Sequence, residues 1–210
     1  MDIDNVKNIL IKINEQLQLN KEYLSELDAA IGDGDHGHNM AKGFGKVAED
    51  LKENEYTDIG SMFKKVAMLL ISNVGGASGP LYGTAFMELG KEYTGLNELK
   101  IEDLEKILEL SIKGIKFRGK AELEDKTIID SLEPAYNSVK ESLKNNEPKE
   151  EVLNKMVDFS KEGVEHTKEI IARKGRASYL GERSIGHQDP GVTSTYIILK
   201  TIRDNILGEK

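Results

Sequence analysis

Apolar residues recur at intervals of three and four along most of the chain, the spacing that places them on one face of an α-helix. Three stretches carry this pattern most clearly: Ile3 to Leu17, Ile59 to Leu70 and Ile101 to Ile115. The alternation typical of strands is nearly absent. Further helical patterns cover residues 21–30, 38–53, 80–94, 131–145, 150–172 and 191–207. The pattern therefore predicts an all-α chain of eight or nine amphipathic helices with mostly short links.

The links between these helices alternate in character. Those near residue 20 and at 54–57, 95–100 and 145–149 are polar turns, whereas those at 28–38, 73–79, 118–129 and 173–191 are long and hold more than half of the 20 glycines. In an up-and-down arrangement of antiparallel helices, alternate links lie at the same end, so we expect the four glycine-rich loops to meet. Glycine allows a backbone to approach a ligand closely, which indicates a functional face. The alternative, that long loops simply collect glycine, does not predict the alternation.

The first glycine-rich loop carries three carboxylates, Asp28, Asp33 and Asp35, within the sequence DAAIGDGDHG. Carboxylates about 5 Å apart repel by roughly 3 kcal/mol per pair at an effective dielectric near 20, so the cluster calls for a cation. Oxygen ligands suit Mg²⁺ or Ca²⁺, and Mg²⁺ often shares its coordination with phosphate. An EF-hand is excluded because its twelfth position would be Phe44. The alternative is a solvated turn without metal.

The start of the next helix and the second loop add groups that suit phosphate. His36 and Asn39 follow the carboxylates directly, which favours ligand contact for His36. The second loop reads SNVGGASGP and ends at Ser78 and Pro80, the start of a predicted helix whose free N–H groups can hold an anion. It lacks the lysine of a P-loop, and tight helix packing is the competing explanation. Thr84, one turn further on, lines the site or faces a neighbouring helix.

The third loop leads into two apolar residues, and the fourth loop carries several basic ones. The third, RGKAELEDKT, precedes Ile128 and Ile129, which are suited to cover an aromatic base, although the loop also fits a solvated linker. The fourth closes with Asp189, Pro190 and Gly191 at a helix start. Basic residues gather in it although the protein is acidic: Arg173, Lys174, Arg176 and Arg183. A basic loop facing an acidic one indicates a metal-bound anion, with a polyphosphate nucleotide as the simplest ligand.

Composition sets the broad class. The 210 residues are 38% hydrophobic and 31% charged, which fits a single domain spanning residues 1–210. The formal net charge of −8 disfavours nucleic acid or an anionic membrane as partner. With no cysteine, an acidic N-terminal segment and no apolar run long enough for a membrane, we expect a cytoplasmic protein.

Four motifs in order, DAAIGDGDHG, GGASGPLYGTAF, RGKAELEDKT and GRASYLGERSIGHQDPGVTS, resemble those of the nucleotide-binding L subunit of dihydroxyacetone kinase (the DhaL family) over almost the whole chain. The resemblance implies an up-and-down antiparallel barrel of eight helices that binds ADP or ATP and two Mg²⁺ ions at one end. It implies that Asp28, Asp33 and Asp35 are the metal ligands. It assigns contact with the nucleotide to His36, Gly37, His38, Asn39, Ala77, Ser78, Gly119, Ile128, Arg176, Asp189, Pro190 and Gly191. Two positions depart from the family pattern: His38 replaces a threonine, and Ile128 a methionine.

The resemblance also implies phosphoryl transfer in glycerol metabolism, as a subunit of a phosphoenolpyruvate-glycerone phosphotransferase. ADP is rephosphorylated in place by a phosphohistidine-carrying M subunit of the phosphotransferase system. The γ-phosphoryl group then passes to dihydroxyacetone on a K subunit. Arg176 is the candidate catalytic residue, stabilising the transferred charge. A free-standing chain favours this phosphoenolpyruvate-dependent type.

Three alternatives remain at this point. The chain could be the L component of an ATP-dependent dihydroxyacetone kinase, or of a fatty acid kinase, whose chains are normally longer. It could also be a regulatory module that recruits a transcription regulator when loaded with nucleotide. A homodimer is compatible with any of these.

Overall fold

The computed structural model describes residues 1–208, so the last two residues of the predicted 1–210 domain lie outside the described part. The described chain forms nine α-helices and one 3₁₀ segment: α1 (Ile3–Leu19), α2 (Lys21–Ile31), α3 (His36–Glu53), α4 (Ile59–Asn73), α5 (Ser78–Glu92), α6 (Asp103–Gly119), α7 (Ile129–Lys144), α8 (Lys149–His166), η1 (Arg176–Ser184) and α9 (Pro190–Leu207). Within residues 1–208 the β pairing is limited to an isolated bridge between Asp2 and Glu98. The all-α prediction is confirmed.

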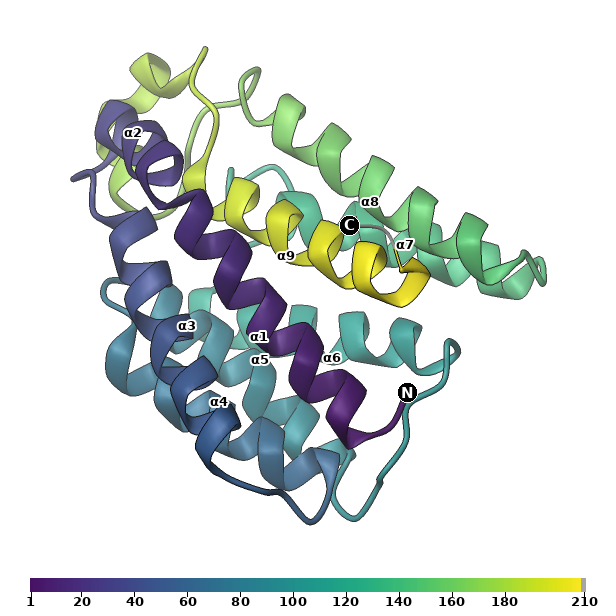
Figure 1. The fold of residues 1–210 in the computed structure, drawn as a ribbon. Coiled ribbons are helices and arrows are strands. Elements are labelled where there is room, and N and C mark those ends of the chain that lie inside the picture. The colour runs from purple at the N-terminus through teal and green to yellow at the C-terminus, as the bar shows by residue number, and fades with distance from the viewer. Residues whose placement is uncertain (209–210) are drawn as a thin grey trace.

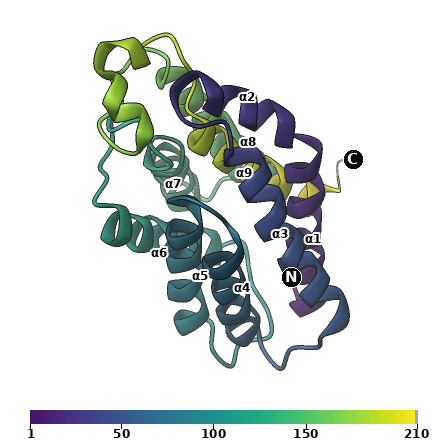
Figure 2. The same cartoon turned by 90° about the vertical axis from the view of Figure 1, so that its left-hand side faces the viewer.

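Eight of the α-helices form a closed ring (Figure 1). From α3 to α9 each helix packs against the next, and α1 joins the two ends by packing against both α3 and α9. Helix α2 lies outside the ring, across one end, where it packs against α3, α9 and η1 (Figures 1 and 2). The up-and-down barrel of about eight helices is therefore confirmed, with α2 and η1 as additions at one end.

The ring closes because each helix turns an apolar face inward. Side chains from successive helices, such as Leu17, Phe44, Leu70, Ile129 and Met156, have at most 1% of their surface exposed and belong to one continuous core. Burying each such side chain contributes about 1.5–3 kcal/mol. An apolar cavity of about 570 Å³, partly open to solvent, also lies between these helices. The periodic pattern thus sets both the helices and the inward face of each.

Polar caps fix where several helices begin. Asp2, Asp58 and Asp189 each precede a helix and accept a hydrogen bond from the backbone N–H three residues further on, at 2.8–2.9 Å. This satisfies one N–H group that the first turn leaves without an intrahelical partner. Pro190 follows Asp189 at the first helical position, as the sequence predicts.

Helix α3 begins two residues before the predicted 38–53 segment, and α2 runs on to Ile31. The predicted 28–38 loop therefore shrinks to residues 32–35. Asp28 lies in the last turn of α2, where its carbonyl accepts the N–H of Gly32. The apolar pattern missed this because His36 and Gly37, which open α3, are not apolar although both are buried.

The predicted 150–172 helix is too long, because α8 ends at His166. Residues 167–189, which we call the strap, connect α8 to α9. The strap folds back on itself: the Lys168 carbonyl accepts the Gly186 N–H at 2.7 Å, and Thr167 Oγ1 accepts the Asp189 N–H at 3.2 Å. These bonds replace the continuation of α8. The 3₁₀ segment η1 inside the strap was not predicted.

None of the helices in residues 1–208 combines the length and the apolar character needed to cross a lipid bilayer.

Candidate functional site

All four glycine-rich loops meet at one end of the barrel, as the alternation of links predicts. They surround a cleft of about 450 Å³. The cleft is lined by Asp28, Ile31, Asp33, Asp35, His36, Asn39, Gly75, Gly76, Ala77, Ser78, Pro80, Leu81, Ile115, Arg118, Gly119, Ala121, Lys126, Thr127, Ile128, Lys174, Gly175, Arg176, Ala177, Asp189, Pro190 and Gly191. Segments more than 150 residues apart in sequence thus form one site.

Three carboxylates form one wall of the cleft. One oxygen from each of Asp28, Asp33 and Asp35 lies within 4.8 Å of the others. Asp28 Oδ2 accepts the backbone N–H groups of Asp35 at 2.9 Å and His36 at 3.2 Å. These bonds fix the orientation of the Asp28 carboxylate against the start of α3. Within the described chain, this is the cluster whose geometry could hold a metal ion.

The donor set of this wall fits a hard divalent cation. It offers carboxylate oxygens only, the ligands that Mg²⁺ and Ca²⁺ prefer. A cationic group already lies against it, since Arg176 Nη2 is 2.8 Å from Asp33 Oδ2. The position therefore accepts positive charge, and the residues present fit a magnesium ion.

The N-terminus of α5 forms another part of the lining. Ala77, which precedes this helix, and Ser78, its first residue, line the cleft, and Ala77 makes no side-chain capping bond to the first turn. Gly76 has a φ of +65°, which favours glycine. A Cβ on Gly75 would lie 2.6 Å from the Asn39 side-chain oxygen, so a larger residue would have to displace the Asn39 side chain. Such a helix terminus attracts phosphate groups.

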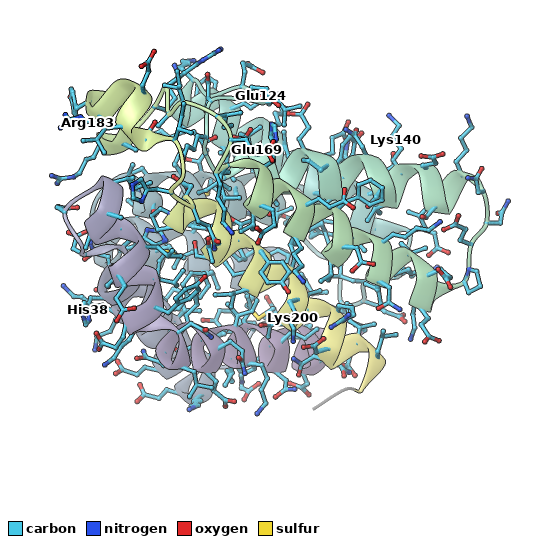
Figure 3. All side chains as sticks on the ribbon, turned by 90° about the horizontal axis from the view of Figure 1, so that it is seen from above. His38, Glu124, Lys140, Glu169, Arg183 and Lys200 are labelled. Atoms are coloured by element: carbon cyan, nitrogen blue, oxygen red, sulfur yellow. The ribbon has the colours of Figure 1, made fainter. Side chains whose placement is uncertain are left out.

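The basic side chains divide into two groups. Lys174 and Arg176 line the cleft, and so does Arg118 from the end of α6. Arg173 and Arg183 do not line it, and Figure 3 shows Arg183 at the periphery of the molecule. The sequence therefore predicted the basic loop correctly as a region, but the fold selects which of its side chains face the carboxylates.

An apolar patch completes the cleft. Ile128 lines it, together with Leu81, Ile115 and Ala121, and offers a surface for a flat aromatic ring. Ile129 has no exposed surface and packs in the barrel core instead. Of the two isoleucines predicted to cover a base, only Ile128 is placed to do so.

Burial changes the pKa of two groups in the cleft. Burial lowers the pKa of His36 despite the nearby carboxylates of Asp28 and Asp35, which favours its neutral form. Burial also raises the pKa of Asp189 to about 6, against the opposing effect of backbone N–H bonds from Val192 and Gly191. Asp189 therefore carries its charge at some cost in free energy.

Two predicted contact residues do not line the cleft. Gly37 packs against α2, where a Cβ would lie 1.8 Å from the Lys21 carbonyl oxygen. His38 is exposed on the outer surface beside Glu22, with its Nε2 3.6 Å from the carboxylate (Figure 3). Thr84 is also absent from the cleft; its hydroxyl donates to the Pro80 carbonyl, and its backbone packs against Gly114 of α6. For Thr84 the structure favours the helix-packing interpretation.

Sequence reasoning missed Lys126. Its side chain has 1% exposed surface, lines the cleft with its neighbour Thr127, and its ammonium group donates to the backbone carbonyls of Ser184 and Ile170. Burial lowers the pKa of Lys126, while Asp189 opposes the shift. The lysine ties the third loop to the strap. Its mixed-charge sequence context resembles a solvated linker, so no local signal marks it.

Comparison with known proteins identifies relatives over most of the chain. Residues 30–204 match the DAK2 domain. The ADP-binding subunit DhaL of a PEP-dependent dihydroxyacetone kinase from Listeria innocua is 44% identical over 88% of this chain and 87% of its own length. The ADP-binding subunit DhaL of the PTS-dependent kinase of Lactococcus lactis is 42% identical, covering 96% and 97% respectively.

A solved structure shows the same fold. The dihydroxyacetone kinase of Citrobacter freundii in its native form matches with a TM-score of 0.74 and 26% identity over 95% of this chain. The match covers 34% of the length of that kinase, so this chain spans about a third of it. Its complex with AMP-PNP and Mg²⁺ matches with a TM-score of 0.70 and 25% identity, covering 95% of this chain and 33% of that one. The chain therefore belongs to the DAK2 domain family, among the L subunits of dihydroxyacetone kinases.

Proposed function

We propose that this protein is the ADP/ATP-binding L subunit of a phosphoenolpyruvate-dependent dihydroxyacetone kinase. The observation that carries the proposal is the cleft itself. Three carboxylates, a helix N-terminus and two cationic side chains of the strap line the same cleft. The carboxylates suit divalent metal, and the helix N-terminus and the cationic groups suit phosphate, so together they fit a metal-bound diphosphate. The names of relatives that match almost end to end support the same ligand.

Different residues of this chain would bind the metal, the phosphates and the base of the nucleotide. Asp28, Asp33 and Asp35 would hold two Mg²⁺ ions, which when bound neutralise charge on the nucleotide phosphates. The backbone N–H groups of Ala77 and Ser78 would donate hydrogen bonds to phosphate oxygens. Ile128 would cover the base. His36, Asn39 and Gly119, and Asp189 to Gly191, would close the remaining sides, whereas Gly37 and His38, which do not line the cleft, would take no direct part.

Arg176 is the candidate catalytic residue. It lies on the strap, its guanidinium touches Asp33, and two-thirds of its side-chain surface is exposed. An arginine in this position can move from the carboxylate to the transferred phosphoryl group and stabilise the charge that develops there. This chain supplies no nucleophile in the proposal. A K subunit would bring dihydroxyacetone, and a phosphohistidine-carrying M subunit would rephosphorylate ADP in place.

The binding proposal is tested with purified protein. Denaturation should release ADP or ATP, and the refolded or nucleotide-stripped protein should bind Mg·ADP in a calorimetric titration. Protein that releases no nucleotide and binds no Mg·ADP would refute it. Titration of metal-free, ADP-loaded protein with Mn²⁺, followed by electron paramagnetic resonance, should show two equivalents of bound Mn²⁺.

Reconstitution of the kinase from its subunits would identify the phosphoryl donor. With K and M subunits present, phosphoenolpyruvate and the general phosphotransferase proteins should sustain many turnovers from a catalytic amount of ADP. Free ATP without the M subunit should support far fewer. Equal turnover from ATP alone would assign the chain to an ATP-dependent kinase instead. The regulator and the homodimer stay predictions of the sequence.

A further inference from the structure

A chain of buried hydroxyl groups connects the cleft to the interior of the barrel. His36 Nε2 lies 3.0 Å from Ser194 Oγ, and the Tyr82 hydroxyl lies 3.2 Å from Ser194 Oγ and 2.8 Å from Thr195 Oγ1. Each of these four side chains has at most 8% of its surface exposed. Tyr82 and Thr195 also line the apolar cavity, whereas His36 lines the cleft. The chain of hydroxyls therefore forms part of the wall between them.

The hydrogens in this wall can be assigned by counting donors. Ser194 Oγ donates to the Gly191 carbonyl at 2.9 Å, and Thr195 Oγ1 donates to the same carbonyl at 2.9 Å. A carbonyl can only accept, and each hydroxyl has one hydrogen. When both hydroxyls donate to this carbonyl, they act as acceptors for their other partners. Tyr82 supplies its hydrogen to this pair, since burial raises its pKa to about 12 and keeps it a neutral donor.

This arrangement gives His36 one role. With Ser194 acting as an acceptor, His36 Nε2 donates the hydrogen between them. An imidazole with a single ring hydrogen then has none on Nδ1. That nitrogen lies 3.4 Å from Ser78 Oγ, at the start of α5, so it accepts the Ser78 hydroxyl hydrogen. The hydrogen bond at Nε2 thus determines whether Nδ1 acts as a donor or as an acceptor toward Ser78.

We propose that Ser194, supported by Tyr82, is a positioning residue that fixes His36 in the Nε2–H tautomer and thereby orients Ser78, which lines the cleft at the start of α5. Ser194 and Tyr82 touch no ligand in this proposal; they act through His36. The effect on nucleotide affinity rests on the proposed function, whereas the tautomer does not. Two variants remove the support in different ways: Ser194→Ala deletes the acceptor, and Tyr82→Phe deletes one hydroxyl while keeping the ring that packs edge-on against Phe44.

The first test is nuclear magnetic resonance of the nucleotide-free protein with ¹⁵N-labelled histidine. The chain has four histidines, and a His36→Gln variant identifies the His36 signals by their loss. We expect a protonated Nε2 and a bare Nδ1 in the wild type, and a mixture of tautomers in Ser194→Ala. A wild-type ring protonated on Nδ1, or an unchanged tautomer in Ser194→Ala, would overturn the proposal.

The second test is calorimetric binding of Mg·ADP. We expect Ser194→Ala to bind about tenfold more weakly, the equivalent of about one net hydrogen bond, and Tyr82→Phe to bind more weakly by a smaller factor. Matched controls are Thr201→Val and Tyr93→Phe, which remove buried hydroxyls bonded to the carbonyls of Ile197 and Asp103, away from the cleft. Equal losses of affinity in the controls would overturn the proposal, because general destabilisation would then explain them. Wild-type protein with the expected tautomer but no affinity for Mg·ADP would contradict the proposed function and leave the assignment of His36 intact.

Discussion

At the scale of single residues, Asp28 shows how a local pattern acquires its role from its neighbours. Its carboxylate lies in the last turn of α2 and accepts two backbone N–H groups from the start of α3. Asp33 and Asp35 then stand on either side of a glycine in a four-residue link. The two backbone donors hold the Asp28 carboxylate in one orientation, which suits a metal ligand.

Asp33→Asn and Asp35→Asn test this cluster directly. Each change removes one charge, so we expect Mg·ADP affinity to fall by at least about 100-fold, because Mg²⁺ relies on few protein carboxylates. The melting temperature without ligand should stay the same or rise, since like charges are removed. Calorimetry and circular dichroism measure the two quantities. Asp158→Asn, an exposed carboxylate on α8, is the control, and an equal loss of affinity there would contradict the assignment.

The raised pKa of Asp189 predicts that the stability of the protein depends on pH. Its pKa in the folded protein is about 6, above the ordinary value of 3.8, so the favourable contribution of its protonated form is complete below pH 3.8 and lost as the pH rises through 6. Asn caps a helix as well as Asp does, so Asp189→Asn keeps the bond to Val192 and removes the buried charge. We expect the variant to be more stable than the wild type by about 3 kcal/mol at pH 8 and equal to it at pH 3.5. Urea unfolding without ligand at both pH values measures this; a difference independent of pH would refute it.

At the scale of elements, the helices approach one another where glycine removes a side chain. Gly163 on α8 faces the backbone of α7, and a Cβ there would lie 1.9 Å from the Asp130 carbonyl oxygen. Asp130 in turn accepts the N–H groups of Glu124 and Thr127, which order the loop below Ile128. The contact between α7 and α8 therefore supports one side of the cleft.

Gly163→Ala should lower the free energy of unfolding by about 2–3 kcal/mol, because the backbones of α7 and α8 must separate. Gly45→Ala on α3 is the matched control. A Cβ there has a nearest neighbour at 3.5 Å, the side-chain nitrogen of Gln18, so we expect a gain of about 0.5–1 kcal/mol from helix propensity. Urea denaturation compares the two, and a gain in both variants would show that α7 and α8 can move apart freely.

At the scale of the whole molecule, one rigid ring presents four separate loops to one ligand. The ring is held by a continuous core, whereas the loops contribute to the cleft through polar groups and backbone. A ligand that binds only the folded state raises stability in proportion to the logarithm of its concentration above Kd. Binding should therefore protect all four loops together.

Hydrogen exchange with and without Mg·ADP tests this cooperation. We expect increased protection in residues 28–39, 75–81, 118–128 and 174–191, because each segment lines the cleft. The turns at 54–58 and 145–148, at the other ends of their helices, should exchange at the same rate in both states. Protection confined to the carboxylate loop would show that the strap and α5 do not take part in binding.

The sequence predicted much of this arrangement. Helical periodicity identified the helices, and the alternation of polar and glycine-rich links predicted that four loops meet at one end. Both depend on local rules, the 3.6-residue repeat and the reversal of direction at each short link. The three carboxylates were identified because like charges at short spacing require compensation wherever they lie. These features follow from the order of residues alone.

Only the tertiary structure decided which side chains reach the cleft. His38 lies one residue from Gly37 and two from His36, yet it faces outward, because successive residues of a helix point in different directions. Lys126 and Ser194 carry no local signal, and their roles come from the carbonyls and the imidazole that the barrel brings to them from distant segments. Whether Arg176 or Arg183 meets the carboxylates depends on how the strap folds back. Periodicity and charge along the chain determined the barrel and its acidic end, and packing between elements determined which other groups line the cleft.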